Sequence, residues 1–155
     1  MMGTMDTMPS HDDANLILRL YELRRDETMR KARQWFVENY FASNLEEAGA
    51  LCPPGSQENA YMRQVTSYWE MAASFVAGGV LNQELFFQSN QELLLVWMRV
   101  RGILPDMRIK MKSPRAWKNL EAVGNAYIEY LQRTAPGTFE GFEERMARPA
   151  PKPQS

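Results

Sequence analysis

Residues 82–93 read NQELFFQSNQEL, so the same four-residue word begins at Asn82 and again at Asn90. An asparagine side chain accepts a hydrogen bond from a free backbone N–H at a helix start, and a glutamate two positions later lies near the positive end of the helix dipole. The repeat therefore predicts two helix starts, one for a short helix over 82–88 and one for a long helix from Asn90. Two words eight residues apart are too close to be a structural repeat unit.

Helical spacing continues after this stretch. Apolar residues recur three or four positions apart from Leu93 to Met111 and predict one long helix. Pro105 lies inside it and removes one backbone donor, so we expect a kink there. Ser113–Pro114 has the pattern of a cap followed by proline at the first helical position, which predicts a further helix start. The expected buried face of that helix is Trp117, Leu120, Gly124, Tyr127 and Leu131.

The chain before residue 82 is also helical in pattern. We expect a first helix from a cap at Asp12 or Asp13 to about Phe41, with the charged residues 24–27 solvated in its middle. The pair Gly78–Gly79 ends another helix, with one of the two glycines in the left-handed conformation. The remaining predicted helices are 43–51, 56–77 and a short one from Thr138 to about Met146.

Runs of valine, isoleucine and threonine at period two, which are typical of strands, are absent between Asp13 and Ala147. The predicted fold is therefore all-α, an irregular helical bundle of four long helices with two or three short connecting helices. Each long helix carries one tryptophan, which we expect to anchor a shared core. These tryptophans are Trp35, Trp69, Trp97 and Trp117.

A chain of 155 residues with net charge −1 fits one domain. We expect a disordered leader over 1–13, a helical domain over 14–147 and a proline-rich disordered tail over 148–155. The N-terminus lacks the basic and apolar regions of a secretory signal, and the longest nearly apolar stretch, Met71–Leu81, is shorter than the ~20 residues of a membrane helix. A lone cysteine fits a reducing interior, so we expect a cytoplasmic protein without membrane contact.

One histidine and one cysteine exclude a zinc cluster built from these residues, a disulfide framework and a Cys-x-x-Cys pair within one chain. His11 lies in the expected leader, where it is poorly placed for nucleophilic catalysis. Cys52 lies at a helix end that does not lower a thiol pKa. We therefore expect no metal, no cofactor and no catalytic residue, although an enzyme that uses only carboxylates, lysines and tyrosines stays open.

The charge layout is the most informative feature for function. Residues 99–118 hold seven basic side chains and one acidic one, a local charge of +6, whereas residues 43–98 carry −5. The basic segment could be a binding surface for a polyanion, or its side chains could pair with the acidic segment of the same chain or of a second copy. The near-neutral total charge favours pairing, so we expect a protein partner or self-association and no nucleic acid. The candidate anion-binding or partner-binding residues are Arg99, Arg101, Arg108, Lys110 and Lys112.

Glu70 is the acidic residue that is hardest to place. The helical wheel puts it opposite Tyr61 and Val65, which favours exposure to solvent. If it faces a neighbour instead, an ion pair with an arginine of the 90–112 helix is the economical solution. A pocket formed by Trp69, Trp97 and those arginines is the corresponding ligand-binding hypothesis.

Several short patterns together resemble a family of bacterial helical domains called domain of unknown function 4760. They are Tyr68-Trp69-Glu70-Met71-Ala72-Ala73, Gly79-Val80-Leu81-Asn82, Val96-Trp97 and Arg108, and the resemblance covers about Arg63 to Leu131. Asn82 stands where the family pattern often has aspartate. The resemblance implies an all-helical domain and supplies no catalytic residues. We therefore expect a non-enzymatic interaction or regulatory module, or alternatively a small-ligand or anion-binding domain with a pocket near the Trp97 helix.

Overall fold

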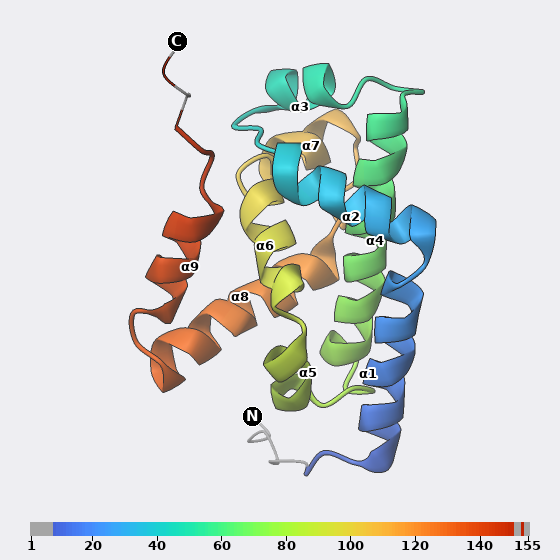
Figure 1. The fold of residues 1–155 in the computed structure, drawn as a ribbon, viewed down its shortest axis with the longest axis vertical. Helices are drawn as coiled ribbons and strands as arrows, with labels where there is room; N and C mark the ends of the chain where they lie inside the picture. The colour runs from blue at the N-terminus through green and yellow to red at the C-terminus, as the bar shows by residue number, and fades with distance from the viewer. Residues whose placement is uncertain (1–7, 151–152, 154–155) are drawn as a thin grey trace.

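The computed structural model describes residues 8–150 and residue 153 (Figure 1). Within these residues all regular structure is helical, so the all-α prediction is confirmed. The helices are α1 (His11–Arg24), α2 (Glu27–Asn39), α3 (Leu45–Leu51), α4 (Gln57–Ala77), α5 (Gln83–Ser89), α6 (Gln91–Val100), α7 (Leu104–Lys110), α8 (Lys118–Thr134) and α9 (Thr138–Met146).

The longest helix, α4, organises the bundle. It packs against α2 on one side and against α8, and α8 in turn packs against α6 (Figure 1). In the figure α8 crosses the bundle obliquely, and its far end leads to α9 at the edge opposite α4. Most of the buried apolar side chains come from α2, α4, α6 and α8, so the centre of the core lies between these helices.

The single helix expected up to Phe41 is two helices, α1 and α2. Asp26 is the reason, because its carboxylate accepts a hydrogen bond of 3.2 Å from the Met29 N–H and caps α2. Arg24, expected in a solvated stretch, is buried at the end of α1. The start of α1 also differs from the prediction, since Ser10 is the cap and forms a capping box with Asp13.

The long helix expected after Asn90 is likewise divided. Residues 101–103 form a turn between α6 and α7, and Pro105 lies in the first turn of α7. An N–H missing at that position leaves no helical hydrogen bond unmade, so proline is compatible with a new helix start. The expected kink is therefore a complete break.

The first asparagine of the repeated four-residue sequence has one role at Asn82 and another at Asn90. Asn82 caps α5 by accepting from the Leu85 N–H at 2.9 Å, as predicted. Asn90 precedes α6 but makes no cap hydrogen bond to it. Its side chain is buried, where it accepts from Arg24 Nη1 at 2.6 Å and donates to the Phe86 carbonyl at 2.9 Å.

Two of the four tryptophans are core anchors. Trp69 is 0% exposed and Trp97 is 4% exposed, whereas Trp35 and Trp117 are half-buried. The Arg24 guanidinium lies 5.2 Å from the Trp69 ring centroid, and among the described residues no hydrogen-bond partner faces Trp69 Nε1. The one-anchor-per-helix prediction therefore holds for α4 and α6 alone.

The predicted leader and tail fall mostly outside the described residues. Residues 1–7 of the leader and residues 151, 152, 154 and 155 of the tail are not described, while His11–Asp13 belong to α1. Residues 148–150 are non-helical, and the Arg148 side chain contacts Glu47 of α3 at 3.6 Å.

Candidate functional site

The end of α7 has an unusual residue in a left-handed backbone conformation. Lys112 has φ 52°, the Lys112 N–H donates to the Ile109 carbonyl, and the Ser113 N–H donates to the Arg108 carbonyl. This pair of bonds is a Schellman motif, in which glycine is the usual left-handed residue. Helix α4 ends in the same way with Gly79, at φ 77°. A lysine thus stands where this chain elsewhere uses glycine.

The segment that follows is a turn and not the predicted helix start. The Ala116 N–H donates to the Ser113 carbonyl, with Pro114 at the second position of the turn. Helix α8 begins only at Lys118, after Trp117, which is itself left-handed at φ 52°. Trp117 is therefore at the cap position and is not part of the helix face on which we expected it.

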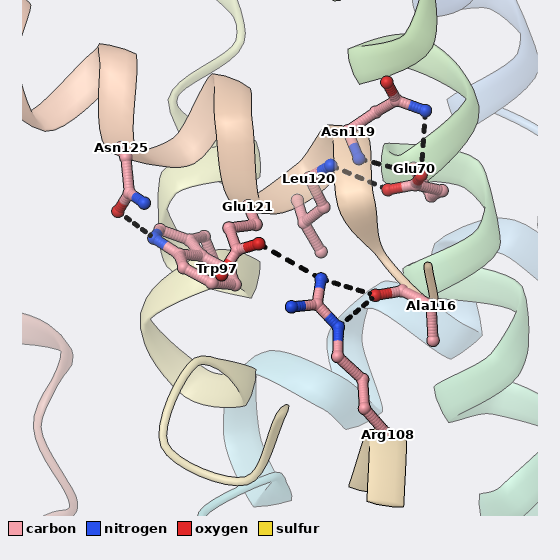
Figure 2. Close-up of polar contacts among 8 residues, drawn as sticks. All are labelled: Glu70, Trp97, Arg108, Ala116, Asn119, Leu120, Glu121 and Asn125. Carbon is pink, nitrogen blue, oxygen red and sulfur yellow. Dashed lines mark hydrogen bonds and ion pairs between the residues drawn. The ribbon is translucent and has the colours of Figure 1, made fainter. Parts of the chain in front are cut away.

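The Arg108 side chain forms hydrogen bonds that stabilise this turn (Figure 2). Its Nε and Nη2 donate to the Ala116 carbonyl at 3.0 and 2.8 Å, and Nη2 also contacts Glu121 Oε1 at 3.1 Å. The guanidinium thus joins the end of α7, the turn and the first turn of α8. Two bonds to one carbonyl fix the position of Ala116 through a planar fork.

Glu70 of α4 caps α8 from outside that helix (Figure 2). Its carboxylate accepts from the Asn119 N–H and Nδ2, both at 3.0 Å, and from the Leu120 N–H at 2.7 Å. Trp117 has no side-chain acceptor to serve these free N–H groups, and a negative charge is favourable at a helix start. Glu70 is half-buried, so the expectation that it is exposed to solvent is wrong. Its partners are N–H groups of α8, and Arg108 pairs with Glu121 instead, so the alternative of an ion pair between Glu70 and an arginine of the 90–112 helix is wrong as well.

Trp97 fixes the next turn of α8. Its Nε1 donates to Asn125 Oδ1 at 3.0 Å (Figure 2). Its side chain also lies against Gly124. Glu70, Arg108 and Trp97 were noted in the sequence as separate parts of one resemblance. The structure brings all three to the first two turns of α8 and to the turn before it.

The surface above this network is the α7–α8 corner, which we define as residues 109–118. Two large apolar side chains are exposed there, Ile109 at 77% and Met111 at 64%. Met111 was expected on a buried stripe, but the break at 101–103 ends that stripe. The exposed basic side chains of the corner are Lys110, Lys112, Arg115 and Lys118, and among the described residues none of them forms an ion pair.

The other candidate arginines, Arg99 and Arg101, have partners within the chain. Arg99 donates to the carbonyls of Phe36, Val37 and Tyr40 at the end of α2, and burial lowers the pKa of its guanidinium. Arg101 pairs with Glu143 of α9 at 3.3 Å. The carboxylate partners of Arg101 and Arg108 lie in α9 and α8, outside the acidic segment that we expected to supply them. The five candidates therefore separate into three arginines that have partners within the chain and two surface lysines that form no ion pair with the described residues.

A hollow of about 250 Å³ lies between α6, the residues after α2 and the end of α9. Arg99, Arg101 and Arg148 line it together with Glu143. A second hollow lies between α2 and Glu92 of α6, where Glu92 pairs with Arg33 at 2.8 Å. Trp69 and Trp97 line neither of these two hollows, so the predicted tryptophan pocket does not coincide with them.

Three further features of the described residues concern metal ligands, membrane spans and the Cys52 thiol. No three of their histidine, cysteine, aspartate and glutamate side chains are grouped so that they could bind a metal ion. None of their helices combines the length and the apolar character that crossing a membrane requires. Cys52 is buried at the end of α3, and this burial raises the pKa of its thiol to about 11.

Sequence reasoning found the lysines of the corner but missed its apolar residues. The signal was the alternation of Ile109 and Met111 with Lys110 and Lys112, which no buried helix face would show. The Glu70 contacts left no local signal, because its partners lie 49 and 50 positions away.

The architecture is an all-helical one in which α4 and α6 hold the start of α8. The chain belongs to the family described as Domain of unknown function (DUF4760), whose model matches residues 9–127. The match extends from the capping residues of α1 to Tyr127 in α8, and so includes the α7–α8 corner. Comparisons with curated proteins and with solved structures give no match.

Proposed function

We propose that this domain is a protein-interaction module and that the α7–α8 corner is its binding surface for an acidic protein partner. One observation carries the proposal. Ile109 and Met111 are exposed and alternate with Lys110 and Lys112, which have no acidic partner among the described residues. Exposed apolar area bordered by polar side chains is a feature of interaction sites, and uncompensated charge of one sign favours a partner of the opposite sign.

The backbone of the corner supports this proposal. A left-handed lysine costs about 1–2 kcal/mol relative to glycine in the same place. Residues held in such conformations cluster at functional sites, where the surrounding structure enforces them. Arg108 and Glu70 supply that enforcement through their bonds to Ala116, Asn119 and Leu120. A surface that is fixed before binding loses less entropy when a partner docks.

The chemistry of the corner also supports one kind of partner. Four cations that form no ion pair with the described residues favour a surface rich in glutamate and aspartate. The two apolar side chains require apolar contact area as well, which a nucleic-acid backbone does not offer. An anionic membrane offers both, so vesicles have to be one arm of the test.

The test uses the full chain labelled for nuclear magnetic resonance and titrated with a synthetic amphipathic helix of glutamate and leucine. We expect shifts concentrated at the amides of 109–118. The variants K110E/K112E and I109S/M111S should each weaken binding by about tenfold or more, since a buried apolar side chain contributes about 1.5–3 kcal/mol.

The matched control is R19E/R63E, which makes the same change in net charge on exposed residues of α1 and α4. It should bind the peptide like the unaltered chain. Vesicles of phosphatidylglycerol and a mixed-sequence DNA duplex are the other two probes. Binding of either at the corner with greater affinity than the peptide, or peptide binding that ignores both corner variants, contradicts the proposal.

A second candidate function is binding of a small anion in the hollow lined by Arg99, Arg101 and Arg148. Three guanidinium groups around one open volume of about 250 Å³ favour it. Inorganic phosphate is the probe, and R101Q/R148Q is the variant. Saturable shifts at residues 98–101 that disappear in the variant would support this function, and unchanged spectra at millimolar phosphate would exclude it for phosphate.

A further inference from the structure

Helix α9 lies outside the part of the chain that the family model matches. The match ends at Tyr127, and α9 begins at Thr138. Its connection to α8 is the segment Ala135–Pro136–Gly137, in which Gly137 has φ 91°. Proline cannot continue a helix and left-handed glycine reverses the chain, so these residues form a hinge between two separate helices.

Two aromatic side chains attach α9 to the bundle. Phe139 and Phe142 are three positions apart, so they lie on one face of the helix, and both are buried. The helix packs mainly against α8. Figure 1 shows α9 at the edge of the molecule, away from α2 and α4.

The far end of α9 is held by polar contacts next to an open volume. Arg99 Nη2 donates to the Met146 carbonyl at 3.1 Å. Arg101 pairs with Glu143, and each of these two side chains is about 40% exposed. The hollow of about 250 Å³ lies at this end, so close packing does not continue beneath it. Solvent-exposed contacts of this kind are the ones that open locally at low cost.

Charge is complementary across this contact. Helix α9 carries Glu140, Glu143 and Glu144 against the single Arg145, and the α6 side carries Arg99 and Arg101. We propose that the surface of α6 and α8 beneath α9, called here the α9 face, is a docking site for an acidic amphipathic helix with two aromatic residues three positions apart. In this structure α9 occupies the site as an intramolecular, displaceable ligand.

The partner that fits the α9 face therefore shares the chemistry of α9. It competes with α9 for the same arginines and for the volume of Phe139 and Phe142. The local concentration of α9 is high because three residues join it to α8, so an external helix binds the unaltered chain weakly. Weakening the attachment of α9 should open the site to such a helix.

The test uses the full chain with the substitutions F139S and F142S, which detach α9 without shortening the protein. The probe is a fluorescent peptide of residues 135–148 in its natural sequence. We expect saturable binding to F139S/F142S in fluorescence anisotropy, and affinity at least about tenfold weaker for the unaltered chain because α9 competes. Equal affinity for both proteins would place the peptide elsewhere and overturn the proposal.

Charge exchange provides the specificity control. Adding R101E to the F139S/F142S chain should weaken peptide binding by about threefold to tenfold, and a peptide with Glu143 replaced by arginine should recover it. A peptide with both phenylalanines replaced by alanine keeps its charge and should not bind. The K110E/K112E substitutions of the α7–α8 corner should leave peptide binding unchanged, which separates this site from the proposed function.

Hydrogen exchange on the unaltered chain tests the same proposal if F139S/F142S does not fold. The amides of 139–146 should exchange together and at least about tenfold faster than those of 120–131 in α8. If the amide hydrogens of 139–146 exchange only when the whole protein unfolds, α9 is not displaceable and the proposal is wrong. Absence of peptide binding to F139S/F142S that is folded by circular dichroism would also overturn the proposal.

Discussion

The carboxylate of Glu70 accepts a hydrogen bond of 2.7 Å from the Leu120 backbone N–H, and so one helix supplies the cap of another. The bond at Asn119 completes the arrangement. An N-cap usually comes from the residue before the helix, but here that residue is Trp117. The start of α8, and the corner in front of it, therefore depend on the position of α4.

Replacing Glu70 by alanine should lower the free energy of unfolding by about 1–3 kcal/mol, because two half-buried N–H groups lose a charged acceptor. Urea denaturation measures this loss. Glu84 is the matched control, since it is an exposed glutamate in the first turn of α5, and its replacement should cost less than about 1 kcal/mol. Equal losses at the two sites would contradict the role given to Glu70.

Replacing Gly124 by alanine should destabilise the domain by about 1–3 kcal/mol through overpacking. A Cβ at this position would lie 2.8 Å from Trp97 Cβ and closer still to Cγ and Cδ1. Gly49 in α3 has no atom within 4 Å of its own Cβ position, so its change to alanine should stabilise by about 0.5–1 kcal/mol. Thermal denaturation of both variants should give shifts of opposite sign.

Replacing Lys112 by glycine should raise the free energy of unfolding by about 0.5–1 kcal/mol, because relief of the left-handed strain exceeds the entropy that glycine loses on folding. Lys112→Ala is the control, since it removes the charge but keeps a Cβ, and it should give no such gain. If the corner binds an acidic partner, the glycine variant should be more stable and bind more weakly. A destabilised Lys112→Gly would contradict the strain argument.

The Cys52 thiol should couple stability to alkaline pH. Burial, with a smaller contribution from Glu58, raises its pKa from 9.0 to about 11 in the folded protein. The folded chain then holds this proton more tightly than the unfolded chain, so the contribution is present below pH 9 and is lost as the pH rises towards 11. The stability difference between the unaltered chain and Cys52→Ala should therefore shrink between pH 8 and pH 10.5 in urea denaturation, and a constant difference would contradict the raised pKa.

The parts of the fold that sequence predicted well are those whose signals are local. Ser56 and Asn82 cap helices through N–H groups three residues away, and Gly79 ends α4 through bonds to the preceding turn. Asn90 repeats the word of Asn82 but takes another role because Arg24, 66 positions earlier, binds its side chain. No pattern within a short window contains that information.

The candidate site likewise contains residues that local sequence signals predicted and an arrangement that they did not. Its lysines were visible as a run of charge, and Glu70, Trp97 and Arg108 were visible as parts of a resemblance. That these three residues converge on α8 follows from the packing of α4 and α6, which composition and periodicity do not determine. The exposure of Ile109 and Met111 follows from the break at 101–103, where Pro105 allowed either a kink or a new helix.

Polar contacts between residues that are far apart in the sequence also constrain when the nascent chain can fold. The Leu20 carbonyl has its partner in Tyr68, Arg24 has its partner in Asn90, and Glu70 has its partners in Asn119 and Leu120. In each pair the earlier residue leaves the ribosome long before the later one. A nascent chain that folds before residue 120 has emerged would bury these polar groups without their partners, which is costly. This domain therefore completes its structure as one unit after the start of α8 has emerged.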